Sequence, residues 1–137
     1  MIARWVAVFG FAAVCSATVG CSGTPAGPAA MPLPLGHWTG EGCLSVAQSG
    51  CDLVVGCGHG QFPRPLLGTD GAFVADGTYR IEAGPVSISP PPPARFSGVV
   101  SGRTLTVTVV PADGSSPPAS YRLQLTSNSG TCIVPCV

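Results

Sequence analysis

Two short spacings place soft ligand atoms close together in this sequence. Cys57 and His59 are separated by one residue and Cys132 and Cys136 by three, with His37 as a further imidazole. Thiolates and imidazoles bind zinc and copper, and thiols also support redox chemistry. One hypothesis is therefore a metal-handling or redox protein that uses Cys57, His59, Cys132 and Cys136. The spacings differ from the Cys-x₂-Cys pairs of zinc modules, so the sequence predicts no metal site and no cofactor.

The carboxylates offer little for catalysis, which needs acids, bases or nucleophiles held close together. Three of them precede a glycine, as turn-forming aspartates do: Asp70, Asp76 and Asp113. The other three take outward positions of predicted strands: Glu41, Asp52 and Glu82. His59 lies between glycines and is the one side chain we would test as a ligand or catalytic group. The sequence holds no nucleophile elbow or phosphate-binding glycine loop, so it predicts a protein that is not an enzyme.

The charge composition excludes one class of partner. Six arginines balance six carboxylates, and charged residues make up 9% of the chain, whereas average soluble domains carry about 25%. Recognition of nucleic acid begins with a basic stripe or patch, which this composition does not supply. The sequence therefore predicts no nucleic-acid partner.

The first twenty residues have the layout of a secretory signal peptide. Met1 to Arg4 carries one positive charge, Trp5 to Val14 is apolar, and Ser16 to Gly20 consists of small residues. The uncharged stretch from Trp5 to Gly20 is shorter than the roughly 20 apolar residues that a spanning helix needs. A retained transmembrane helix is the alternative to cleavage.

The segment Thr18-Val19-Gly20-Cys21 resembles the lipobox of bacterial lipoproteins, in which a small residue precedes a cysteine that becomes lipidated. The resemblance implies lipidation of Cys21 and anchoring of the protein to a membrane of the bacterial cell envelope. Two or more acyl chains hold a protein firmly, since each buried CH₂ group contributes about 0.8 kcal/mol. The alternative is ordinary cleavage, which would release a secreted protein.

Composition changes again after Cys21. Residues 21–35 are rich in glycine, proline and alanine and carry no charge, which predicts a semi-rigid tether. The remaining residues, 36–137, are enough for one domain. The predicted organisation is a lipoprotein signal peptide at 1–20, a tether at 21–35 and a single all-β domain at 36–137.

Alternation with a period of two residues dominates that domain. Leu105, Val107 and Val109 fall on one face of their segment while threonines take the other, as in a half-buried strand. Similar rows are Tyr121, Leu123 and Leu125; Cys51, Leu53, Val55 and Cys57; Phe73, Ala75, Tyr79 and Ile81; and Trp38, Leu44 and Val46 in a first strand. Phe62 and Phe96 mark two more strands.

Turn signals separate these rows, and no helical period persists for ten residues outside the leader. They are Gln48-Ser49-Gly50, Thr69-Asp70-Gly71, Ala75-Asp76-Gly77, Ser101-Gly102, Asp113-Gly114 and Asn128-Ser129-Gly130. The sequence therefore predicts an all-β fold after a signal-peptide helix: one antiparallel meander of 7–8 strands, closed as a small barrel or folded as a sandwich. Both a filled interior and one that holds a small ligand fit eight strands, and we favour the filled one.

Several motifs are spread across the domain: Gly36-His37-Trp38-Thr39-Gly40, Cys57-Gly58-His59-Gly60, Asp70-Gly71-Ala72-Phe73, Gly77-Thr78-Tyr79, Gly84-Pro85-Val86, Ala94-Arg95-Phe96-Ser97-Gly98 and Leu105-Thr106-Val107-Thr108-Val109. On these motifs the domain resembles uncharacterised small bacterial envelope lipoproteins with a lipocalin-like β-meander. The pair Gly36 and Trp38 is similar to the first motif of lipocalins, in which the tryptophan closes the barrel floor. The resemblance implies an architecture and a compartment, and it implies no chemistry.

Five cysteines remain once Cys15 leaves with the leader and Cys21 carries lipid. Export would place them in an oxidising space, where disulfides persist. Two bridges and one free thiol can be drawn among five cysteines in 5 × 3 = 15 ways. The resemblance implies a bridge between Cys57 and Cys136.

Cys43 and Cys51 flank the turn at Ala47 to Gly50, and we predict them as the second bridge. Alternation places these two side chains on opposite faces, so the bridge would need a bulge near Gly40 or Gly42. Cys132 would then be the unpaired thiol.

The sequence thus predicts a bacterial cell-envelope lipoprotein whose domain is a non-catalytic binding or structural module. Its predicted partners are the membrane, through the lipid anchor, and either a small apolar ligand or another envelope protein. The metal-handling or redox protein described above is the alternative.

Overall fold

Ten strands form in the computed structural model, which describes residues 30–82, 89–126, 132 and 135–136. Eight belong to one sheet: β2 (Gly36–Gly40), β3 (Cys43–Ala47), β4 (Gly50–Val55), β5 (Gly58–Phe62), β7 (Ala72–Ile81), β8 (Pro93–Ser101), β9 (Thr104–Pro111) and β10 (Ala119–Thr126). Two short strands, β1 (Met31–Pro32) and β6 (Leu66–Leu67), pair as a separate ribbon.

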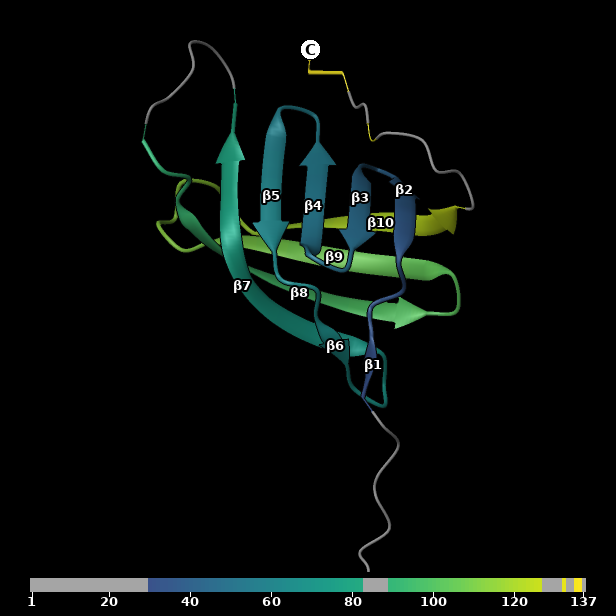
Figure 1. Cartoon of the computed structure of the whole chain (residues 1–137). Helices are drawn as coiled ribbons and strands as arrows, with labels where there is room; N and C mark the ends of the chain where they lie inside the picture. Colours follow the sequence, from purple (N-terminus) through teal and green to yellow (C-terminus); the bar gives the residue numbers. More distant parts are fainter. Residues whose placement is uncertain (1–29, 83–88, 127–131, 133–134, 137) are drawn as a thin grey trace, which may run out of the picture.

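The sheet closes on itself as an antiparallel barrel (Figure 1). Each strand pairs with its neighbour along the chain, and β10 returns to pair with β2, for example Leu125 with Trp38. The predicted all-β meander is confirmed, and it is a barrel rather than a sandwich. The predicted signal-peptide helix, Cys21, residues 22–29 of the tether and the turn signal at 128–130 lie outside the described residues.

Alternation sorts the side chains as the sequence predicts. Leu105, Val107 and Val109 point into the barrel and are buried, while the threonines between them lie outside. Trp38 and Leu44 also share the inner face, but they belong to different strands, because the chain turns at Glu41 and pairs Trp38 with Leu44 across the β2–β3 hairpin. The predicted first strand is therefore two strands.

Aromatic rings and glycines fill the interior together. The ring of Phe62 stacks on Phe96 with centroids 4.4 Å apart and on Phe73 at 6.2 Å. A Cβ atom at Gly60 would lie 2.9 Å from Phe96 and 3.3 Å from Tyr79, which is too close for ordinary contact. Glycine on β5 therefore makes room for the large rings of β7 and β8, and the barrel is packed rather than hollow.

Gly77 corrects one turn prediction. The signal Ala75-Asp76-Gly77 lies inside β7, whose residues Ala72 to Thr78 pair without interruption with β8. A Cβ atom at Gly77 would collide with the backbone oxygen of Gln61 on β5. The glycine thus allows β5 and β7 to approach closely, which is the second common role of glycine in a strand besides a turn. The signals at Gly50, Gly71, Gly102 and Gly114 do mark turns, each with positive φ.

The folded part begins before Gly36. Leu33 is fully buried, its N–H donates to Pro65 O at 2.9 Å, and its carbonyl accepts Arg64 Nε at 2.8 Å. The indole Nε1 of Trp38 donates to Pro34 O at 3.3 Å. Residues 30–35, assigned to the tether from composition, therefore close one end of the barrel together with the β1–β6 ribbon.

No helix within the described part of the chain has both the length and the apolar character required to cross a bilayer.

Replacement of Gly60 by alanine tests the packed interior. Because the new methyl group must displace the rings of Phe96 and Tyr79, Gly60→Ala should lower the free energy of unfolding by about 1–3 kcal/mol. Adding Phe96→Leu to the same chain should recover part of this loss. The measurement is denaturant unfolding with disulfides intact.

The matched control is Gln61→Ala on the next, outward-facing position of β5, which should change stability by less than about 0.5 kcal/mol. Equal stability of Gly60→Ala and the parent protein would show that the interior has space to spare.

Candidate functional site

The residues of the metal or redox hypothesis lie at the end of the barrel opposite the β1–β6 ribbon. The β2–β3 and β4–β5 turns lie at this end (Figure 1), and the alternating strand directions place the β9–β10 turn there as well. Two disulfides tie Cys132 and Cys136 to this end, Cys43–Cys132 and Cys57–Cys136, with Cα–Cα distances of 5.5 and 4.7 Å. We call this the crosslinked end.

The Cys57–Cys136 disulfide is the pair that the family resemblance implies. Cys57 lies in the turn between β4 and β5, and its carbonyl accepts the N–H of Glu82 at 2.7 Å. The Sγ of Cys136 lies 3.8 Å from Glu82 O. The bridge therefore fixes the C-terminal segment against the β4–β5 turn and the end of β7.

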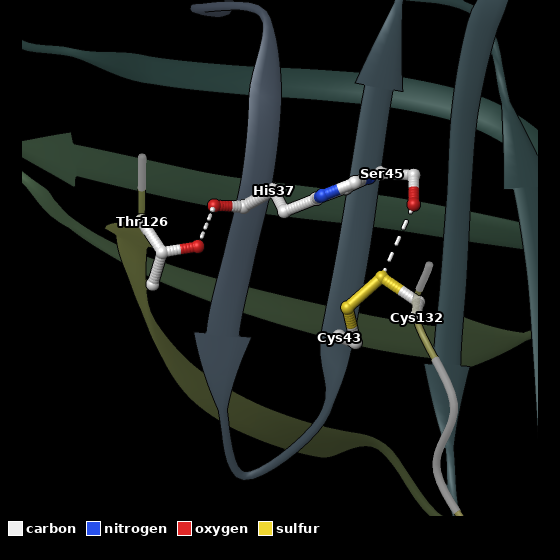
Figure 2. Close-up of a disulfide and its surroundings, with 5 residues drawn as sticks. All are labelled: His37, Cys43, Ser45, Thr126 and Cys132. Carbon is white, nitrogen blue, oxygen red and sulfur yellow. Dashed lines mark hydrogen bonds between the residues drawn. A yellow bond between two sulfur atoms is a disulfide. The ribbon is translucent and has the colours of Figure 1, made fainter. Parts of the chain in front are cut away.

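The second predicted disulfide is wrong: Cys43 pairs with Cys132, not with Cys51 (Figure 2). Cys43 is opposite Val54 and Cys51 is opposite Val46 in the β3–β4 pairing, so the two cysteines differ in position and in face. No bulge interrupts that pairing. Cys132, predicted to be unpaired, instead reaches the outward-facing Cys43 from the C-terminal segment.

Polar contacts accompany the Cys43–Cys132 disulfide on the outer face of β2 and β3. Ser45 Oγ lies 3.1 Å from Cys132 Sγ, and the hydroxyl must donate because a disulfide sulfur carries no hydrogen. Thr126 Oγ1 donates to His37 O at 3.1 Å, where β10 ends beside β2 (Figure 2). Cys132 is thus held against β3 by a covalent bond and a hydrogen bond.

Cys51 is the free cysteine of the described residues, and it is buried inside the barrel. Burial, which outweighs the opposing charge of nearby Arg64, raises the pKa of its thiol to about 11. A thiol that stays protonated at neutral pH is a poor nucleophile and a poor metal ligand. The buried position of Cys51 therefore favours a role in packing the barrel interior.

The four residues of the metal or redox hypothesis are not brought together as ligands. Cys57 and Cys136 are bonded to each other, and Cys132 is bonded to Cys43. His59 Nε2 lies 3.5 Å from Glu82 Oε2, and both side chains are about half exposed. Among the residues that the structure describes, no group of three or more His, Cys, Asp or Glu side chains is arranged to hold a metal.

The carboxylates are all exposed, and the structure explains most of them by local bonds. Asp70 Oδ1 accepts the N–H of Ala72 at 3.0 Å, and Asp113 Oδ1 accepts the N–H of Ser115 at 2.9 Å. The hydrogen bonds from Ser115 lower the pKa of Asp113. Asp76, predicted as a turn former, instead lies on β7 3.3 Å from Arg95 Nε.

Sequence reasoning missed two features that shape the molecule. The first is Leu33, the one leucine of the tether that becomes fully buried. The second is the pair Gly58 and Gly60, whose spacing of two places both on the inner face of β5. That spacing is a usable signal, because glycines in phase with inward positions indicate close packing against large rings.

Comparison of the chain with protein-family models, with curated proteins and with solved structures finds no match in any of the three. The architecture therefore defines the class of protein. The chain holds a closed, eight-stranded antiparallel β-barrel domain in meander order, tied by two disulfides.

The losses of stability caused by removing each disulfide alone should not add up to the loss caused by removing both. Each alone closes a long loop, of 89 and 79 residues in sequence separation. With one bridge intact, the other closes only the short ring of fourteen residues from Cys43 to Cys57 and four from Cys132 to Cys136. The chain-entropy relation gives about 3 kcal/mol for such a ring and about 4.5 kcal/mol for a long loop.

Removal of either bridge by paired Cys→Ser substitutions should therefore lower the free energy of unfolding by about 3 kcal/mol, and removal of both by about 7–8 kcal/mol. Guanidinium unfolding without reductant measures this difference. The control Ser45→Ala keeps both bridges and removes only the hydrogen bond to Cys132. A loss of about 4.5 kcal/mol for each bridge alone would contradict the interlocked arrangement.

The buried thiol gives a chemical test of the same pairing. Native protein treated with iodoacetamide at pH 8 should show no alkylation of Cys51, because burial raises its pKa to about 11. After unfolding without reductant, peptide mapping should find Cys51 as the alkylated cysteine among the five of the domain. Since the folded state holds this proton more tightly, stability should fall as the pH rises from the ordinary thiol range toward 11. Alkylation of Cys132 would contradict the structure.

Proposed function

We propose that this chain is an exported bacterial cell-envelope lipoprotein, acylated at Cys21, whose barrel is a non-catalytic binding or structural module. The observation that carries the proposal is the pair of disulfides that fastens the C-terminal segment to the barrel. Disulfides form and persist in oxidising compartments and are rare in the cytosol. They agree with a leader that ends at a lipobox-like Thr18 to Cys21.

The packed interior supports a role for the surface rather than for a cavity. Trp38, Phe96 and Leu123 are fully buried inside the barrel, and Gly60 has no space for a methyl group beside the rings. Barrels that carry a small ligand need an unfilled interior, which this packing does not provide. The module would therefore act on a partner in the envelope through its outer face, and a small apolar ligand would bind in a surface hollow.

The lipocalin-like resemblance adds to the proposal. Trp38 lies near the end of the barrel that Leu33 and Pro34 close, and its indole N–H is bonded there. In lipocalins the first tryptophan closes the barrel floor, so this position of Trp38 supports the resemblance. The carboxylates of the described residues are exposed and four of the domain cysteines are bonded in pairs, which supports a non-catalytic module.

Substitution of the acylated cysteine tests the anchor. The full chain and Cys21→Ala should be expressed in a bacterium that processes lipoproteins, and cells should be separated into membrane and soluble fractions. We expect the parent chain in the membrane fraction with an acylated N-terminal cysteine by mass spectrometry, and at least a tenfold loss of membrane-bound Cys21→Ala, since acyl chains supply the anchoring energy.

The control is Cys15→Ala, which removes the neighbouring cysteine of the same leader. This variant should remain acylated and membrane-bound. Recovery of the parent chain in the cytoplasm, with its leader intact and its sulfhydryls reduced, would overturn the proposal.

A further inference from the structure

Apolar side chains are exposed at the end of the barrel where the chain enters, which we call the entrance end. Met31 on β1 is 71% exposed and Leu66 on β6 is 62% exposed, with Leu35 also exposed in the segment that leads into β2. Beside them lies a surface hollow of about 550 Å³, lined in part by Met31, Leu67 and Val100. Large apolar side chains gathered on a surface mark an interaction site.

The arginines at this end suit an anionic surface. Arg64 and Arg103 lie here, each with one hydrogen bond to a backbone oxygen, that of Leu33 at 2.8 Å and that of Leu125 at 2.9 Å. A guanidinium has five N–H donors, so each retains donors for phosphate. Two exposed carboxylates lie in the same part of the barrel: Asp70, which already accepts a backbone N–H, and Asp52 near the start of β4.

The crosslinked end carries exposed charges. The exposed carboxylates of Glu41, Glu82 and Asp113 lie in or next to its turns. Arg80, Arg95 and Arg122 also lie near that end, so its charges are of both signs, and the exposed apolar side chains are what distinguish the entrance end.

The short length of chain between Cys21 and the barrel indicates which surface the entrance end would contact. Eight residues, 22–29, separate Cys21 from Ala30, and Ala30 itself lines the hollow beside Met31. Such a segment spans at most about 30 Å when fully extended. Acyl chains on Cys21 would thus hold this end of the barrel within reach of the bilayer that contains them.

We propose that the entrance end docks on the bilayer surface, with Met31, Leu35 and Leu66 in the headgroup region and Arg64 and Arg103 facing lipid phosphates. This inference rests on the proposed acylation of Cys21. It places the crosslinked end and its disulfides away from the membrane, facing the envelope space. Interfacial binding of this kind combines buried apolar area with attraction between basic side chains and anionic lipid.

The rate of methionine oxidation measures whether this end is covered, because Met31 is the single methionine after Met1. The acylated protein carrying Ile81→Met should be reconstituted in vesicles of phosphatidylethanolamine and phosphatidylglycerol and treated with hydrogen peroxide. Ile81 is 56% exposed at the far end of β7, so the introduced methionine is an internal control at the crosslinked end. Peptide mass spectrometry gives both rates of sulfoxide formation.

On vesicles we expect Met31 to oxidise at least about fivefold more slowly than the introduced methionine, because headgroups cover it. The same protein with Cys21→Ser, free of lipid, should oxidise both at similar rates. Adding Leu66→Asp to the acylated chain should bring the Met31 rate back toward the lipid-free value, since a carboxylate resists transfer into the interface.

Two results would overturn the inference, and they are distinguishable. If Cys21 is acylated but Met31 oxidises as fast on vesicles as without them, the anchor stands and the docking of the entrance end is refuted. If mass spectrometry finds no acyl group on Cys21, the proposed anchor itself fails, and the docking fails with it.

Discussion

The pairing of β10 with β2 is the interaction on which the rest of this structure depends. It leaves no open edge in the barrel sheet, and closure is the complete solution to the unpaired N–H and C=O groups of edge strands. It also brings the last strand of the barrel beside the first, with Thr126 paired to His37. β10 consequently ends at Thr126 next to β2, whose other neighbour, β3, carries the outward-facing Cys43. Closure thus brings the end of β10 near the strand to which Cys132 is bonded.

Closure also explains why three cysteines of similar sequence context differ in burial and in bonding. Cys51 has the phase of Leu53, so closing the sheet traps its thiol inside among apolar side chains. Cys43 has the opposite phase and is covered only because the C-terminal segment is bonded to it. Cys57 lies in a turn, where strand alternation does not fix the direction of its side chain, and it is bonded to Cys136. The period of two in a strand thus decides which thiols can find partners.

The sequence was sufficient for the architecture because each strand is specified locally. Leu105, Val107 and Val109 alternate with threonines, and glycine turns separate the strands, so an antiparallel meander follows from neighbouring residues. The second disulfide could not be predicted in this way, since Cys43 and Cys132 are 89 residues apart and no strand period relates them. Leu33 was missed for a similar reason. A single leucine among prolines and alanines carries no period, and its burial depends on Pro65 and Arg64 far along the chain.

The two ends of the barrel differ in the way that the proposed lipid tether would require. At one end Leu33 plugs the interior, and the flanking Met31 and Leu66 remain outside because the plug already fills the space. At the other end the interior is bounded by turns, and covalent bonds rather than apolar packing hold the C-terminal segment. A disulfide stabilises the folded chain whether or not water surrounds it, whereas exposed apolar side chains contribute stability only when another surface covers them. The chemistry of each end therefore favours a different neighbour, an apolar or lipid-like surface at one and water at the other.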